Sequence, residues 1–451
     1  MTLMSEDANK FSKKYSDLSV SELLEAALFA DVKEAMGCTE PVAIAIAAAK
    51  ARALTSGSIE TIEVKLSTNL LKNAMEVGIP GTGGSRGISL ATALGALSGI
   101  ENPDMSILES ISEKQLEEAR ALVENGKIAL MLAGKLHGLY VAITVTCENG
   151  SVGKCVISGS HENVVRLEQN GNIIFEAEKK GKSADKVLAL REELSKRPFE
   201  EIWDALPHIS VGLREYLLKG VETNIAVAQA GLESGGLKIG STYNLLMDMG
   251  WMGKDVINRA KALTTAAVDA RMSGMNLPVV TSAGSGNQGL SITLPLYTLA
   301  QEMGEGIDKL AEALAISHCI TTILKHHTGT LSAMCGCVVC SGTGLAAGIT
   351  YMMGGNLEDA TAAVNNMIGS ITGIICDGAK VGCAMKLVCA VDSAFQSAMM
   401  AINGVKLPFT NGIVGHDIPS GLANIGKIAA PGMLATDEQI LDIMLGREMN
   451  F

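Results

Sequence analysis

Three cysteines set among glycines in the C-terminal half carry the clearest potential for chemistry. Cys335 stands in Ser-Ala-Met-Cys335-Gly-Cys337, and the other two close the segment Cys376-Asp-Gly-Ala-Lys-Val-Gly-Cys383. In a chain without a secretory signature, cysteines among glycines favour metal or cluster ligands over disulfides. The competing interpretation is a set of small buried residues, because free cysteine is often buried.

The spacing of these cysteines favours an iron–sulfur cluster over a single ion. In a regular helix Cys376 and Cys383 would lie two turns apart, too far to chelate one small centre, but Gly378 and Gly382 let the chain curl. Tetrahedral zinc prefers close cysteine pairs, whereas a cluster is larger. The third ligand is one of three nearby cysteines: Cys335, Cys337 and Cys340. Three protein ligands would leave one iron open to substrate.

A cysteine near the N-terminus occupies a position that favours its reactive form. In Gly37-Cys38-Thr39-Glu40-Pro41 a helix is expected to begin at Pro41 with Thr39 as its cap. The unpaired N–H groups and positive dipole end of that helix would then face Cys38 and favour its thiolate. Cys38 is therefore a candidate general base or cluster ligand, with an ordinary linker cysteine as the alternative.

A glycine-rich turn follows a short polar segment in the N-terminal third. Asn69-Leu-Leu-Lys72-Asn73 precedes Pro80-Gly81-Thr82-Gly83-Gly84-Ser85-Arg86-Gly87. Backbone N–H groups in such a turn suit an anion such as a carboxylate, and a tight structural turn is the alternative. The pattern matches neither the dinucleotide fingerprint nor the phosphate loop. The candidate substrate-binding residues here are Asn69, Lys72, Asn73, Gly81 and Thr82.

A second polar loop interrupts otherwise apolar sequence between Ser282 and Gly289. It carries Ser285, Asn287 and Gln288. Polar groups in such a place must be satisfied internally or must bind something, and we expect them to bind substrate. His161 stands in another polar loop, which makes it a further candidate for the same site.

Composition excludes some classes of function. The chain has 451 residues and a formal net charge of −12, without the basic stripe that a nucleic-acid partner would require. The uncharged run from Leu331 to Met353 is long enough to span a membrane but lacks basic or aromatic flanks, so a buried core helix is expected instead. The N-terminal residues lack a signal segment, which favours a cytoplasmic location.

Hydrophobic periodicity predicts an α+β fold. Helices are expected over residues 18–36 and 41–54, and the C-terminal half should be all helical. Asn149-Gly150 and Asn170-Gly171 each join two alternating segments, which is a strong hairpin signal. The predicted strands cover residues 61–67, 139–146, 152–157, 163–168 and 173–178. We therefore expect an α+β domain with an antiparallel sheet over residues 1–195 and an all-α cluster domain over residues 196–451.

Four ordered motifs support a more specific interpretation. They are Gly37-Cys38-Thr39-Glu40-Pro41, Pro80-Gly81-Thr82-Gly83, Gly284-Ser285-Gly286-Asn287-Gln288-Gly289 and Ile375-Cys376-Asp377-Gly378-Ala379-Lys380. Together they resemble the L-cysteine desulfidases, iron–sulfur lyases distantly related to bacterial L-serine dehydratases. The resemblance runs from about residue 25 to residue 445. The ordered set is specific, whereas each motif alone is weak.

The resemblance implies breakdown of L-cysteine to pyruvate, ammonia and hydrogen sulfide. It implies an oxygen-sensitive 4Fe-4S cluster in place of pyridoxal phosphate, with Cys335, Cys376 and Cys383 as ligands. Cys335 is preferred to Cys337 because the preceding Leu-Ser-Ala-Met matches the family context of a single cysteine. Cys38 corresponds to the proposed base, and it could instead occupy the open iron until substrate arrives.

Three other functions compete with this expectation. A dehydratase would apply the same cluster chemistry to L-serine, and an iron–sulfur sensor would bind a cluster without turnover. A pyridoxal phosphate lyase would need a lysine in a recognisable cofactor context, which the sequence lacks. The expected partners are the small amino-acid substrate and, at most, a second copy of the chain in a homodimer.

Overall fold

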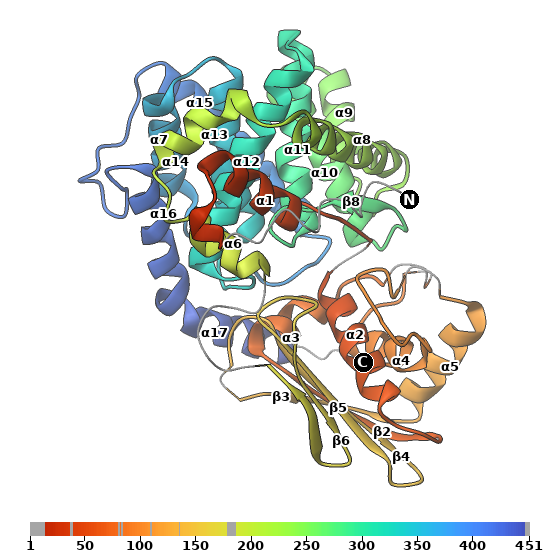
Figure 1. Ribbon diagram of the computed structural model, residues 1–451. Coiled ribbons are helices and arrows are strands. Elements are labelled where there is room, and N and C mark those ends of the chain that lie inside the picture. Colours follow the sequence, from red (N-terminus) through yellow and green to blue (C-terminus); the bar gives the residue numbers. More distant parts are fainter. Residues whose placement is uncertain are drawn as a thin grey trace.

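The computed structural model describes residues 14–36, 39–79, 82, 84–108, 111–134, 136–177 and 186–446. Its elements form a helical part, drawn uppermost in Figure 1, and a lower part built around a sheet. The predicted α+β fold class is thereby confirmed.

A six-stranded sheet forms the centre of the lower part, in the order β3-β2-β4-β5-β6-β7. The strands are β2 (Ile59–Leu66), β3 (Ile128–Leu132), β4 (Tyr140–Cys147), β5 (Val152–Ser158), β6 (Val164–Gln169) and β7 (Asn172–Glu176). Neighbours are antiparallel except β2 and β3, which pair in parallel with Ile62 opposite Ile128. The expected antiparallel sheet therefore carries one parallel edge strand, whose unbroken apolar sequence showed no alternation.

Both Asn-Gly hairpins are confirmed. Asn149-Gly150 joins β4 to β5, and Asn170-Gly171 joins β6 to β7. Gly150, Asn170 and Gly171 have φ angles of 81°, 49° and 82°, in the left-handed region that such short turns require. These turns lie at the lower end of the sheet in Figure 1, so the β5–β6 connection, which carries His161, faces the helical part.

Helices of the lower part approach each other and the sheet through glycines. They are α2 (Thr39–Ala53), α3 (Thr68–Ala74), α4 (Ile88–Leu97) and α5 (Glu113–Glu124). A Cβ on Gly95 of α4 would lie 2.3 Å from Ala45 O, and one on Gly153 of β5 would lie 2.1 Å from Ala51 O. Both distances are far below van der Waals contact, so only glycine permits this packing on α2.

The upper part is a bundle of helices around α13. Its helices are α1 (Val20–Asp31), α6 (Lys186–Leu194), α7 (Phe199–Ala205), α8 (Val211–Ser234), α9 (Ile239–Asp248), α10 (Val256–Met272), α11 (Gly286–Met303), α12 (Ile307–Thr328), α13 (Gly336–Met352), α14 (Leu357–Ile371), α15 (Cys383–Ile402) and α16 (Ile418–Lys427). α13 packs against α11, α12, α14 and α15. The apolar run from Leu331 to Met353 thus contains a helix of the buried core.

The predicted helix over residues 18–36 is shorter in the structure because its end forms a strand. α1 ends at Asp31, and β1 (Glu34–Met36) pairs antiparallel with β8 (Pro278–Val280). Periodicity could not reveal this pairing, since β8 lies far along the chain in the half expected to be all helical. α6 packs on α1 and α12, which attaches the start of the chain to the upper part.

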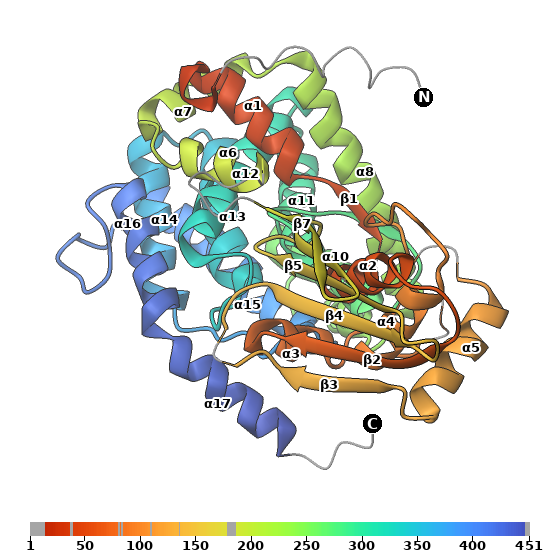
Figure 2. The ribbon, with the colours of Figure 1, turned by 60° about the horizontal axis from the view of Figure 1, so that its bottom comes forward.

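The first and last α-helices of the described residues pack into different hydrophobic cores: α1 into the helical part, and the last helix into the core around the sheet. Leu23 and Leu28 of α1 belong to the core of the upper part, whereas Ile440 and Leu441 of α17 (Leu434–Leu445) belong to the core around the sheet. Figure 2 shows α17 below the bundle, and it packs there against α3. The two cores therefore do not follow a single boundary at residue 195.

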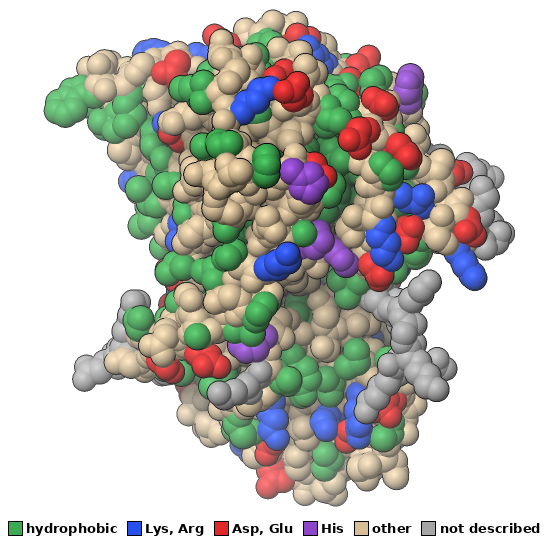
Figure 3. Space-filling model, turned by 90° about the vertical axis from the view of Figure 1, so that its left-hand side faces the viewer, with side chains coloured by type: hydrophobic (Ala, Val, Ile, Leu, Met, Phe, Trp, Pro, Cys, Tyr) green, Lys and Arg blue, Asp and Glu red, His purple; other side chains and the backbone are tan. Residues whose placement is uncertain are grey.

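Among the described residues, α15 is the one helix whose length and composition would allow it to cross a membrane. Core helices pass the same test, and α15 packs against α10, α13 and α14. On the face shown in Figure 3, acidic and basic side chains of the described residues are interspersed, and the molecule narrows between its two parts.

Candidate active site

A short backbone contact places two of the three predicted cluster ligands side by side. The Cys335 N–H donates to Ile374 O (2.9 Å) and the Cys376 N–H donates to Ala333 O (2.7 Å). Cys335 is the N-cap of α13, and Cys383 is the first residue of α15. The segments that precede two core helices therefore bring the three cysteines to the border of one cavity.

Gly378 gives the loop between Cys376 and Cys383 its curled path. Its φ is 95°, and a Cβ on it would lie 2.3 Å from Lys72 O, so a side chain is excluded there. Lys72 Nζ fixes the start of the loop by donating to Cys376 O (2.6 Å). The curl expected at Gly378 is present, whereas Gly382 has ordinary helical angles.

A cavity of about 70 Å³ lies between the two parts of the molecule. There the cysteines meet the loop between Ser282 and Gly289 and the loop that carries His161. Five of the predicted substrate-binding residues line it: Asn73, His161, Ser285, Asn287 and Gln288. Four charged side chains line it as well: Glu40, Arg271, Lys325 and Lys386. The lower part contributes through α2, α3 and the β5–β6 loop, and the upper part through α10, α11, α12, α13 and α15.

Other predicted site residues lie elsewhere or outside the described residues. Asn69 and Lys72 are buried beside the cavity and bind Asp437 of α17, each at 2.5 Å. The Thr82 hydroxyl donates to Ile79 O (2.6 Å) within its own turn. Two further candidates, Cys38 and Gly81, lie outside the described residues.

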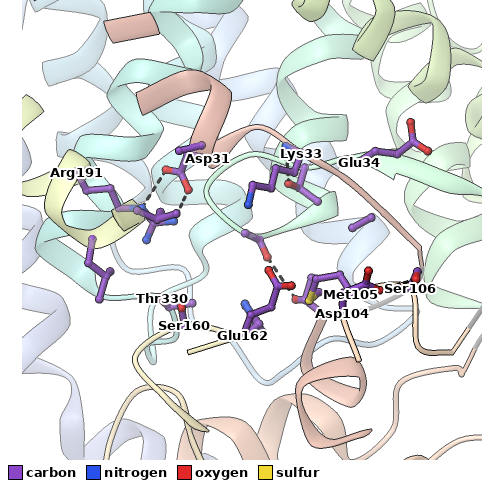
Figure 4. A pocket seen from close by; sticks show the side chains of 18 residues that line it. Asp31, Lys33, Glu34, Asp104, Met105, Ser106, Ser160, Glu162, Arg191 and Thr330 are labelled. Carbon is purple, nitrogen blue, oxygen red and sulfur yellow. Dashed lines mark hydrogen bonds and ion pairs between the residues drawn. The ribbon is translucent and has the colours of Figure 1, made fainter. Parts of the chain in front are cut away.

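A larger cavity of about 360 Å³ adjoins the first. The two share four lining residues: Thr39, His161, Gly284 and Thr330. Figure 4 shows Asp31 and Arg191 joined on one side of the larger cavity, at 2.6 and 2.9 Å, with Asp104 and Ser106 beyond its centre. Because the shared residues belong to both walls, the larger cavity lies directly beside the one that the thiols border.

The structure separates the three competitors for the third ligand position. Cys340 is fully buried with its thiol 3.8 Å from the Thr328 hydroxyl, and it does not line the cavity. Cys335 and Cys337 both line it, and Cys337 contributes to the raised pKa of the Cys335 thiol. The Cys337 thiol also lies 3.8 Å from Ser285 Oγ. The choice is therefore between two adjacent thiols.

Without a metal cation, the three thiols ionise less readily than an ordinary cysteine. Burial raises the pKa of Cys376 and raises that of Cys383 to about 12, while a hydrogen bond with Cys337, together with burial, raises the pKa of Cys335. The Lys386 ammonium opposes each of these shifts. Such thiols lose their protons when a positively charged metal centre arrives.

This donor set fits an iron–sulfur cluster. Among the described residues, no three His, Cys, Asp or Glu side chains are arranged to hold a single metal ion. A cluster binds each thiolate through a different iron, so its ligands stand further apart than those of one ion. Thiols bordering one cavity are the soft ligands that iron–sulfur chemistry uses. Cys335, Cys376 and Cys383 would hold the group, with Cys337 beside Cys335.

The four charged residues of the cavity were missing from the sequence-based prediction. Glu40 belongs to the motif around Cys38, and Lys386 follows Cys383 on the first turn of α15. Lys325 gave the best available signal, because it directly follows the uncharged stretch Ile320–Leu324 of α12. A lysine within a buried helix requires an anionic partner.

His318 should make the stability of this region sensitive to acid. Burial lowers its pKa from 6.5 to about 4, and Nδ1 lies 2.8 Å from Ser282 Oγ in the polar loop. Above pH 6.5 neither the folded nor the unfolded chain protonates this imidazole. As the pH falls from 6.5 to 4, only the unfolded chain binds the proton, so the free energy of unfolding drops by about 1.4 kcal/mol per unit.

The contribution of His318 can be isolated by comparing urea unfolding at pH 7.5 and pH 5.0. Between these two pH values the free energy of unfolding of the wild type should fall by about 2 kcal/mol more than that of His318→Gln. The exposed His208 provides the control, because His208→Gln should keep the wild-type difference. Equal losses in the wild type and His318→Gln would contradict the assignment.

Sequence comparisons match most of the chain, across both parts of the molecule. Residues 103–442 match the model of the serine dehydratase alpha chain. A UPF0597 protein of Desulfatibacillum aliphaticivorans is 37% identical over 426 residues, which cover 93% of this chain and 97% of that protein. UPF0597 proteins of Oleidesulfovibrio alaskensis and Clostridium tetani are 38% and 37% identical, covering 93% and 92% of this chain and 97% and 96% of their own lengths.

Proposed function

Because this chain belongs to the serine dehydratase alpha chain family, we propose that it is a 4Fe-4S-dependent lyase that degrades L-cysteine to pyruvate, ammonia and hydrogen sulfide. One observation carries the proposal. Cys335, Cys376 and Cys383 border the same cavity as the polar loop residues Asn287 and Gln288. The proposed cluster ligands and the proposed substrate-binding groups therefore border one cavity.

The proposed reaction is a β-elimination. A base removes the α-proton, the Cβ–S bond breaks, and its electron pair leaves with the sulfur as hydrosulfide. The resulting enamine tautomerises and is hydrolysed to pyruvate and ammonia. When bound, the cluster supplies a Lewis-acidic iron for the departing sulfur. We propose that Cys38 is the base that removes the α-proton. Thr39, the next residue along the chain, lines the cavity.

The remaining predicted residues divide into substrate contacts and supports. Asn73, His161, Ser285, Asn287 and Gln288 line the cavity and are proposed to contact substrate. Lys72 binds the Cys376 carbonyl oxygen, so we propose that it holds the cysteine loop in place. A cytoplasmic setting is part of the proposal, because all nine described cysteines are free thiols.

L-Serine dehydration is the second candidate, and the family match favours it. The same residues could expel hydroxide in place of hydrosulfide, so the two candidates differ only in the leaving group. A thiophilic iron favours sulfur. We therefore place L-cysteine first and L-serine second.

Anaerobic reconstitution with iron and sulfide, followed by turnover assays, tests the proposal. We expect equal amounts of sulfide and pyruvate from L-cysteine and loss of both after exposure to oxygen. Pyruvate from L-serine alone would establish the dehydratase instead. Cluster absorbance without turnover of any amino acid would indicate a sensor, and activity that persists after iron chelation would indicate a pyridoxal phosphate enzyme.

A further inference from the structure

Lys325 of α12 carries a positive charge into the cavity without a negative partner. Its side chain is only 3% exposed, and its ammonium donates to Thr330 O at 2.7 Å. The structure gives it no salt bridge to any carboxylate of the described residues, whereas the equally buried Lys72 pairs with Asp437. A buried charge without a counter-charge is costly, so this ammonium points to an anionic ligand.

Two other groups face the same point as Lys325. A Cβ on Gly336, the first residue of α13, would lie 3.3 Å from Gln288 Nε2 and 3.4 Å from Lys325 Nζ. α13 begins without a side-chain cap, so the N–H groups of Gly336 and Cys337 are available there, whereas the Val338 N–H donates to Cys335 O. Gln288 is 3% exposed, and its Nε2, the amide donor, is the atom that lies beside Gly336 and Lys325. Its Oε1, which has no hydrogen-bond partner among the described residues, can only accept and therefore suits an ammonium. A carboxylate would meet an ammonium, an amide and a helix N-terminus at this point.

The opposite wall offers acceptors for a cation. Glu40 Oε1 accepts from Asn73 Nδ2 and Glu40 Oε2 accepts from the Thr39 hydroxyl, both at 3.2 Å. Among the described residues Glu40 forms no salt bridge, and Asn73 Oδ1, in a side chain 6% exposed, has no hydrogen-bond partner. A primary ammonium has three N–H donors, so it can satisfy both oxygens at once.

We propose that this cavity is a zwitterion clamp, in which Lys325, Gln288 and the start of α13 bind the α-carboxylate while Glu40 and Asn73 bind the α-ammonium. The clamp rests on the proposed function and names the residues that recognise the two charges of its amino-acid substrate. An N-acylated amino acid would lack one of the two charges. Because Glu40 belongs to the lower part and Lys325 to the upper part, one substrate molecule contacts both.

Equilibrium binding of L-alanine tests the clamp, since L-alanine carries both charges and no leaving group. In NMR titrations, Lys325→Met should weaken the binding of L-alanine and of propionate about 10- to 100-fold and leave the binding of L-alaninamide unchanged. Glu40→Gln should weaken the binding of L-alanine and of L-alaninamide and leave the binding of propionate unchanged. Lys309→Met, on the same helix as Lys325, is the matched control and should change none of the three.

Several outcomes would overturn the clamp. One is no binding of L-alanine to the wild-type protein, and another is equal weakening of L-alanine and L-alaninamide by Lys325→Met. Lys325→Arg keeps the charge and should retain most of the affinity, which separates loss of charge from loss of folding. Failure of the proposed function is distinguishable, because a protein that binds L-alanine with this pattern but releases no sulfide would keep the clamp and lose the lyase.

Discussion

We expect the Cys383→Ser variant to lose the absorbance of the reconstituted cluster and at least about 100-fold in turnover. Substituting a residue that hydrogen-bonds to a metal ligand typically lowers metal affinity or activity about 10- to 100-fold, and the loss of a ligand itself should lower them further. A serine hydroxyl is also a poorer ligand for iron than a thiolate. Iron content, visible absorbance and sulfide release measure the effect.

Cys389→Ser provides the matched control for this experiment. Cys389 lies on the same helix as Cys383 but is exposed, so its substitution should leave the cluster and the turnover unchanged. The same assays decide between Cys335→Ser and Cys337→Ser, and we expect only the first to lose the cluster. Full cluster content in Cys383→Ser would remove this residue from the ligand set.

Asp437→Ala should destabilise the folded protein by about 3–5 kcal/mol, because it leaves the Lys72 ammonium buried without a counter-charge. The Lys72 and Asp437 side chains are 0% and 2% exposed, and the ion pair joins them at 2.5 Å. Asp437 also accepts from Asn69, so the substitution leaves a second buried donor without its acceptor. Urea unfolding at pH 7.5 measures the loss.

Two comparisons isolate the ion pair from other effects. Asp442 lies on the same helix but is exposed, and Asp442→Ala should change the free energy of unfolding by no more than about 0.5 kcal/mol. The double variant Lys72→Met/Asp437→Leu replaces the pair by apolar groups and should recover most of the stability. A double variant as unstable as Asp437→Ala would contradict this explanation.

The sequence predicted those features that depend on local chemistry. Asn170-Gly171 specified its hairpin because few residues tolerate two successive left-handed conformations. The cysteine loop was foreseen in the same way, from Gly378 between Cys376 and Cys383. Asn287 and Gln288 were recognised because polar side chains stood out within an apolar stretch.

Features that depend on distant pairing could not be predicted. β1 looked like the end of a helix until Glu34 was found opposite Val280. Lys72 was predicted to contact substrate, and the sequence could not show that it also pairs with Asp437, which lies 365 positions further along the chain. Lys325 and Glu40 come from separate parts of the fold, and only the three-dimensional structure shows that they border one cavity.

The packing of α1 and α17 into different cores has a consequence for synthesis on the ribosome. The sheet and its strands are made before most of the upper part, but Ile440 and Leu441 of the core around the sheet are translated only after α16. That core therefore stays incomplete until the helices of the upper part have been made, although N-terminal segments usually fold first. Nascent chains should consequently expose that apolar surface to chaperones while the upper part is translated.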